Sequence, residues 1–162
     1  MQGTHIVYGL VGALAIALTV AAFTDIRRRQ IDNWLNAAVA AGAPLFWWAT
    51  GLTLWPGVAL QLALAAITFF VLAGLFALKA MGGGDVKLLT ALALWMPALL
   101  FLKLLVIMAV AGGILTMAMS MWHIARRQKD KLKIPYGIAI ATAGLWIITT
   151  TDWATLHAAT AG

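Results

Sequence analysis

Residues 33–78 contain no Asp, Glu, Lys or Arg. A helix that crosses a bilayer needs roughly 20 largely apolar residues, so this stretch is too long for one crossing and long enough for two. The turn signal Trp55-Pro56-Gly57 lies near its middle. The stretch therefore predicts two consecutive membrane helices, over about 34–54 and 58–78.

The composition agrees with a membrane protein. Of the 162 residues, 64% are hydrophobic and 10% are charged, whereas soluble domains have about 45–50% and 25%. This excludes a soluble enzyme and a nucleic-acid-binding module, and we interpret the net charge of +6 as a marker of cytosolic loops. The absence of Cys excludes disulfides, Cys-ligated zinc and a thiol nucleophile. The three His residues show no metal-ligand spacing, so we expect no metal and no cofactor.

Three further stretches, 5–23, 104–125 and 134–151, are suited to membrane spans. The uncharged stretch 88–102 is short, because at about 1.5 Å per residue it reaches roughly 22 Å of a core about 30 Å thick, and it contains Pro97. Either it fails to span, or its helix begins earlier and takes residues 81–87 toward the membrane interior.

The distribution of basic residues favours six spans. With six, ten of the eleven basic residues share one side and Lys103 alone lies opposite, and the positive-inside rule assigns the rich side to the cytosol. The ten are Arg27, Arg28, Arg29, Lys79, Lys87, Arg126, Arg127, Lys129, Lys131 and Lys133. The fold class predicted is all-α: a polytopic six-transmembrane-helix bundle, residues 1–162 forming a single domain, with both termini outside the cytosol.

Tryptophan positions also fit span ends. Five of the eight Trp residues are expected in interfacial belts, where an amphipathic ring sits at the headgroups: Trp34, Trp55, Trp95, Trp122 and Trp153.

Two carboxylates are candidate catalytic groups because of their positions at the ends of predicted spans. Asp25 follows the first span and Asp85 starts the short fourth one, so the predicted topology brings both to the cytosolic end. Ionisable groups near hydrocarbon are candidate functional groups. Two neighbouring carboxyl groups share a proton, so one can activate water while the other polarises a carbonyl. This is the chemistry of an aspartic protease.

Each of these features also has a structural interpretation. The glycines Gly82, Gly83 and Gly84 before Asp85 would permit close approach by a substrate peptide or a sharp turn, but small residues also serve tight helix contacts or a plain loop. Asp25 is equally compatible with a helix-end carboxylate paired to Arg28 or Arg29.

The other polar residues have simpler expected roles. Asp32 fits an N-cap of the second helix, and Asp130 lies in a basic run that we expect to be solvated. Asp152 falls at the opposite end, too far from the pair to join it. His123 is expected at the interface, and Lys87 is expected to anchor the interface or to contact substrate.

Three motifs resemble the type IV prepilin peptidase family. The segment from Asp25 to Asn33 resembles its first aspartate motif, and Gly82-Gly83-Gly84-Asp85-Val86-Lys87 resembles its Gly-x-Gly-Asp motif. Ile134-Pro135-Tyr136-Gly137 is similar to the Pro-Tyr-Gly segment that opens the family's last helix. The first motif departs from the family because Asp32 stands where Pro is usual.

The resemblance implies an aspartic endopeptidase of the prokaryotic inner membrane, which removes the basic leader of type IV prepilins at the cytosolic face. It implies Asp25 and Asp85 as the catalytic pair, with Gly82 and Gly84 shaping the turn and Lys87 and Asn33 as motif neighbours. Gly83 completes the set of candidate substrate-site residues. The expected partners are a single-span prepilin and membrane lipids, not nucleic acid.

The missing four-Cys region makes the chain similar to the minimal Tad/Cpa type that serves Flp pili, so no N-methyltransferase activity is expected. Two other functions stay open: a small proton-coupled transporter with an Asp25–Asp85 relay, and a non-catalytic membrane protein of pilus assembly.

Overall fold

The computed structural model describes residues 2–126 and 136–153, and within them the chain is all helical. The α-helices are α1 (Gln2–Arg28), α2 (Asn33–Thr50), α3 (Ala59–Ala77), α4 (Gly83–Ala93), α5 (Ala98–Ala125) and α6 (Tyr136–Thr150); a π-type turn, η1 (Leu54–Val58), joins α2 to α3. Within the described residues, three helical stretches are long and apolar enough to cross a membrane: Thr4–Arg28, Leu54–Ala77 and Ala98–Ala125. This agrees with a membrane protein.

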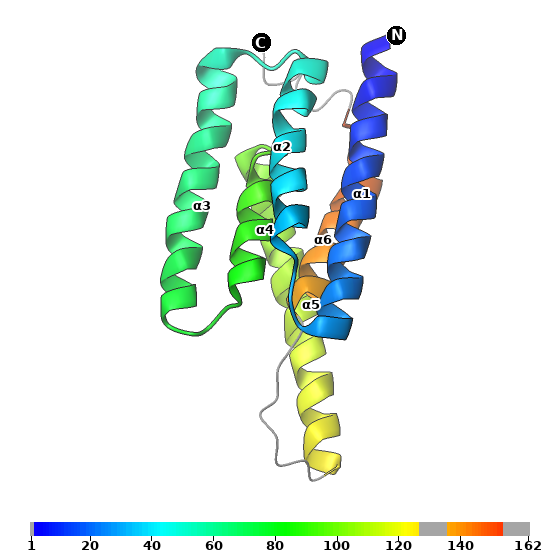
Figure 1. Cartoon of the computed structure of the whole chain (residues 1–162), viewed down its shortest axis with the longest axis vertical. Helices are drawn as coiled ribbons and strands as arrows, with labels where there is room; N and C mark the ends of the chain where they lie inside the picture. The colour runs from blue at the N-terminus through cyan, green and yellow to red at the C-terminus, as the bar shows by residue number, and fades with distance from the viewer. Residues whose placement is uncertain (1, 127–135, 154–162) are drawn as a thin grey trace.

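Successive helices run up and down the bundle, and the short helix α4 lies behind the gap between α2 and α3 (Figure 1). α4 packs against both of these helices, whereas α1 packs against α2 and α6, and α5 packs against α6. The side chains of Leu88, Leu89 and Leu92 on α4 are completely buried. Helix α4 therefore lies at the centre of the bundle.

The stretch 88–102, which the six-span prediction counted as one crossing, is divided between two helices in the structure. A helix over 88–102 is not present, because α4 begins at Gly83 and ends at Ala93, and α5 begins at Ala98. Pro97 is the N-cap of α5; a proline disfavours helical geometry at the preceding residue and so ends a helix before it. The early start agrees with the part of the second alternative that has the helix begin before residue 88. Lys103, which was expected between two spans, lies within α5.

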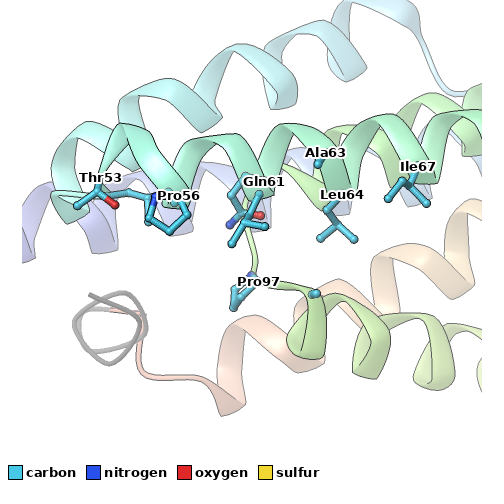
Figure 2. A pocket seen from close by; sticks show the side chains of 11 residues that line it. Thr53, Pro56, Gln61, Ala63, Leu64, Ile67 and Pro97 are labelled. Carbon is cyan, nitrogen blue, oxygen red and sulfur yellow. The ribbon is translucent and has the colours of Figure 1, made fainter. Parts of the chain in front are cut away.

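The α4–α5 turn has its carbonyl groups paired by side chains from other helices. Trp47 Nε1 donates to Leu94 O at 2.8 Å. Gln61 of α3, with its amide nitrogen facing the turn, donates to Ala93 O at 3.1 Å and to Met96 O at 2.9 Å; Figure 2 shows Gln61 beside Pro97. Irregular backbone at membrane depth must find its hydrogen bonds inside the protein, and these contacts supply them.

Replacement of Gln61 by Leu is expected to destabilise the protein. The substitution leaves two buried carbonyl groups without their donor, and each unpaired group costs about 1–3 kcal/mol. Thermal unfolding in detergent should show a clearly lower midpoint than wild type. The matched control is Gln30→Leu, the same chemical change at an exposed position. Equal midpoints for the two variants would contradict this role of Gln61.

Two of the five tryptophans predicted at the interface are buried. Trp34, Trp55 and Trp122 are 63%, 82% and 60% exposed, as expected, but Trp95 and Trp153 are almost completely buried. Both pack on Phe46, with ring centroids 5.1 and 5.7 Å away. The indole N–H of Trp95 also donates to Val39 O at 2.8 Å. The prediction was wrong for this pair because their rings fill the core beside α2.

Candidate active site

Asp25 lies near the end of α1, facing the start of α6. Its side chain is buried, and its Oδ2 accepts a hydrogen bond of 2.8 Å from the backbone N–H of Gly137. Gly137 is in the first turn of α6, where free N–H groups and the helix dipole favour a negative charge. A Cβ on Gly137 would stand 2.7 Å from Asp25 Oδ2, so this approach requires glycine.

Asp85 is in the first turn of α4 and is also buried. The backbone of Gly82, the N-cap residue of α4, lies beside its carboxyl group. Both carboxylates thus lie beside the backbone of a helix start, Asp25 at α6 and Asp85 at its own helix.

The three glycines before Asp85 meet three different neighbours. A Cβ on Gly82 would lie 2.9 Å from Asp85 Oδ2, and one on Gly84 would lie 3.1 Å from Ile31 Cβ. One on Gly83 would lie 3.3 Å from the ring of Phe76. The three glycines thus permit close contact of α4 with the α1–α2 loop and leave space beside the Asp85 carboxyl group.

Asp25 and Asp85 line the same pocket, which has a volume of about 420 Å³. Its walls come from the end of α1, the α1–α2 loop and the start of α4, and its residues are Asp25, Arg29, Gln30, Ile31, Asp32, Asn33, Gly82, Gly83, Gly84, Asp85 and Lys87. The structure therefore places all seven predicted site residues around one hollow, although Asp25 and Asp85 come from helices far apart in sequence.

The surroundings of Asp85 favour its protonated form. Asp85 lies outside the three stretches that are long and apolar enough to cross a membrane. Burial and then the nearby charge of Asp25 raise the pKa of Asp85 to about 6, against the opposing effect of the Gly82 backbone. The backbone groups beside the two carboxyl groups come from different helices: Gly137 of α6 donates to Asp25, whereas Gly82 at the start of α4 lies next to Asp85.

We expect stability to depend on pH through Asp85. Its folded-state pKa of about 6 exceeds the ordinary 3.8, so the folded state holds this proton more tightly than the unfolded state. The resulting stabilisation is complete below about pH 4 and is lost as the pH rises through about 6. Thermal midpoints measured across this range should fall for wild type and fall less for Asp85→Asn. Parallel curves for the two proteins would contradict a buried, protonated Asp85.

The motif neighbours form a polar link next to the pocket. Lys87 Nζ donates to Asn33 Oδ1 at 2.8 Å, which ties the start of α4 to the start of α2. Asn36, one turn further along α2, is buried, and its Nδ2 lies 3.4 Å from Gly84 O. Its Oδ1 accepts no hydrogen bond from the described part of the chain.

The structure describes three of the remaining polar residues, Asp32, Asp152 and His123, and of these three Asp32 alone lines the pocket. Asp32 is at the N-cap position of α2, but its side chain makes no capping bond and lines the pocket. Asp152 accepts a hydrogen bond from Tyr8 OH at 3.1 Å, at the other end of α1. His123 lies near the end of α5 and does not line the pocket. Asp130, Ile134 and Pro135 lie outside the described residues.

Gly137 and Asn36 have roles that sequence reasoning missed. Gly137 belongs to the Pro-Tyr-Gly segment, which marks a helix start, but nothing in the sequence shows that this start meets Asp25. No sequence signal distinguishes Asn36 from an ordinary polar residue in the first turn of a helix.

Among the described residues, no group of three His, Asp or Glu side chains is placed to hold a metal ion.

The chain matches a known family over the region that carries both carboxylates. No curated protein and no solved structure matches it. The sequence model of the type IV leader peptidase family matches residues 12–117, which is more than half of the chain and includes Asp25 and Asp85. The protein therefore belongs to the type IV leader peptidase family.

Proposed function

We propose that this protein is an aspartic endopeptidase that removes the leader of Flp-type prepilins. Asp25 and Asp85 would be its catalytic pair. The observation that carries the proposal is their position in one pocket, buried, with the Gly137 N–H on Asp25. Membership of a leader peptidase family supports the same reaction class.

In the proposed mechanism Asp25 is the general base and Asp85 the general acid. The Asp25 carboxylate removes a proton from water as the water oxygen bonds to the scissile carbonyl carbon, while Asp85 donates its proton to the carbonyl oxygen. The C–N bond of the tetrahedral intermediate then breaks. Asp25 passes its proton to the leaving nitrogen, and Asp85 recovers a proton from a hydroxyl group, so the pair returns to its starting state.

The reaction would take place at the cytosolic face of the prokaryotic inner membrane, within a bundle of six helices whose termini lie outside the cytosol. Basic residues near four helix ends support this orientation. They lie at the ends of α1 and α5, in the α3–α4 loop and near the start of α4: Arg27, Arg28, Arg29, Arg126, Lys79 and Lys87. The pocket opens at this same end of the bundle. Positive charge at the surface would also hold the protein to anionic lipid.

The proposed enzyme cleaves but does not methylate. The chain has no Cys and so cannot form the four-Cys metal site of the larger prepilin peptidases that it resembles. This supports the minimal Flp-type role, whose partner would be a single-span prepilin.

The direct test is reconstitution of the purified chain in nanodiscs with candidate prepilins, followed by N-terminal sequencing of the product. We expect a new N-terminus at the junction between the polar leader and the apolar helix of one Flp-type prepilin. Intact prepilins, together with ion flux in liposomes, would indicate the transporter instead. Pilus assembly that tolerates loss of both carboxylates would indicate a non-catalytic role.

A further inference from the structure

A second hollow adjoins the catalytic pocket and extends from it along the bundle. It has a volume of about 350 Å³ and is lined by Asn33, Asn36, Ala37, Ala40, Phe69, Lys87, Thr90, Ala91 and Leu94. Asn33 and Lys87 line both hollows, so the two hollows adjoin on either side of the Lys87–Asn33 hydrogen bond. We call the second hollow the α2–α3 groove.

The α2–α3 groove has the form of a helix-binding slot. One wall is the face of α2 given by positions 33, 36, 37 and 40, and the floor is the face of α4 given by positions 87, 90, 91 and 94. Both sets follow the i, i+3, i+4, i+7 spacing of one helix face. The opposite wall comes from α3 at Phe69. In Figure 1, α4 lies behind the gap between α2 and α3.

The lining changes from polar to apolar along this path. The catalytic pocket is lined mostly by charged and polar residues and glycine, whereas the α2–α3 groove beyond Asn33 and Lys87 is lined mainly by apolar side chains. Ala37, Ala40 and Ala91 are small, and small residues are what allow two helices to approach closely within a membrane. Asn36, whose buried Oδ1 accepts no hydrogen bond from the residues that the structure describes, lies at the polar end.

We propose that the α2–α3 groove binds the apolar helix of the substrate immediately after the scissile bond. This rests on the proposed function. Such a substrate would have its polar leader in the catalytic pocket and its apolar helix in the groove. This arrangement would match the change in lining and place the junction between leader and helix beside Asp25 and Asp85. The α2 wall spans residues 33–40, about 10 Å at 1.5 Å per residue, so it holds roughly two turns of a bound helix.

A different apolar hollow, between α3 and the start of α5, serves as the matched comparison. It has a volume of about 340 Å³ and includes Ala63, Leu64, Ile67 and Pro97 (Figure 2). None of its lining residues lines the catalytic pocket. A substrate helix bound there would have no continuous path to Asp25 and Asp85.

Single substitutions to Trp distinguish the two hollows. Ala40→Trp fills the α2–α3 groove, and Ala63→Trp makes the same change in the comparison hollow. With a prepilin peptide in nanodiscs, we expect Ala40→Trp to raise KM by about tenfold or more with a smaller change in kcat, as for lost binding. Ala63→Trp should keep wild-type values. An unchanged KM for Ala40→Trp, or a larger rise for Ala63→Trp, would overturn the assignment.

Cross-linking tests the groove without any cleavage and with a smaller structural change. Because the chain has no Cys, Ala40→Cys or Ala63→Cys provides one defined thiol. Each is combined with Asp25→Asn and mixed with prepilin peptides that carry one Cys at successive positions of the helix. Disulfides at Ala40→Cys from the first two turns support the proposal even if no peptide is ever cleaved. Equal or preferred cross-linking at Ala63→Cys contradicts it, whereas absence of cleavage by wild type alone counts against the proposed function.

Discussion

Asp25→Asn and Asp85→Asn should each abolish prepilin cleavage. Asparagine has nearly the same shape as aspartate but can neither remove a proton from water as Asp25 would nor donate the proton held by Asp85. General acid–base catalysis contributes about 10²–10⁴-fold per group, so each single variant should lose at least that factor in kcat/KM. The measurement is the rate of leader removal from a purified prepilin in nanodiscs.

Two comparisons make this result specific. The double variant should be little worse than either single one, because groups that act as a unit are not additive. Asp152→Asn should cleave at the wild-type rate, since Asp152 bonds Tyr8 at the other end of α1. Thermal unfolding must show that each variant is folded. A folded Asp25→Asn or Asp85→Asn with wild-type activity would refute the pair.

Gly137→Ala should reduce kcat by about 10²-fold, although Gly137 carries no reacting group. Its new Cβ would stand 2.7 Å from Asp25 Oδ2 and 2.9 Å from Asp25 Cβ, so the carboxylate or the start of α6 must shift. A displacement of about 1 Å in a catalytic group can cost a factor of this size. Cleavage kinetics should show the loss mainly in kcat, because the substrate groove is not altered.

Gly113→Ala is the matched control for Gly137→Ala. Gly113 is also helical, and nothing lies within 4 Å of the position of its Cβ. This variant should keep wild-type activity and gain up to about 1 kcal/mol in helix stability. If Gly137→Ala were as active as Gly113→Ala, the contact between α6 and Asp25 would have no part in catalysis.

The sequence predicted the helices well because their signals are local. Uncharged stretches and the turn signal at Trp55-Pro56-Gly57 gave helices close to α1, α2, α3 and α6. It also placed Asp25 and Asp85 together, because charge distribution fixes which helix ends share a side. That argument needs no knowledge of packing.

Other features depend on which helices touch, and local patterns do not carry this information. Trp95 and Trp34 both lie near the end of a predicted span, but the packing of Trp95 on Phe46 makes it a core residue. The early end of α4 is possible because Trp47 and Gln61, from two other helices, pair the carbonyl groups of the following turn. The Gly137–Asp25 contact likewise joins residues far apart in sequence.

The central claim is that Asp25 and Asp85 act together on one scissile bond, Asp25 through a water molecule and Asp85 on the carbonyl oxygen. It is tested most directly by an experimental structure of the protein in lipid, with an uncleavable prepilin peptide bound. We predict a carboxyl oxygen of each residue within about 2.6–3.2 Å of one water or of the scissile carbonyl group. A bound peptide whose scissile bond lies away from the pair, or carboxyl groups too far apart to share one water, would contradict the account.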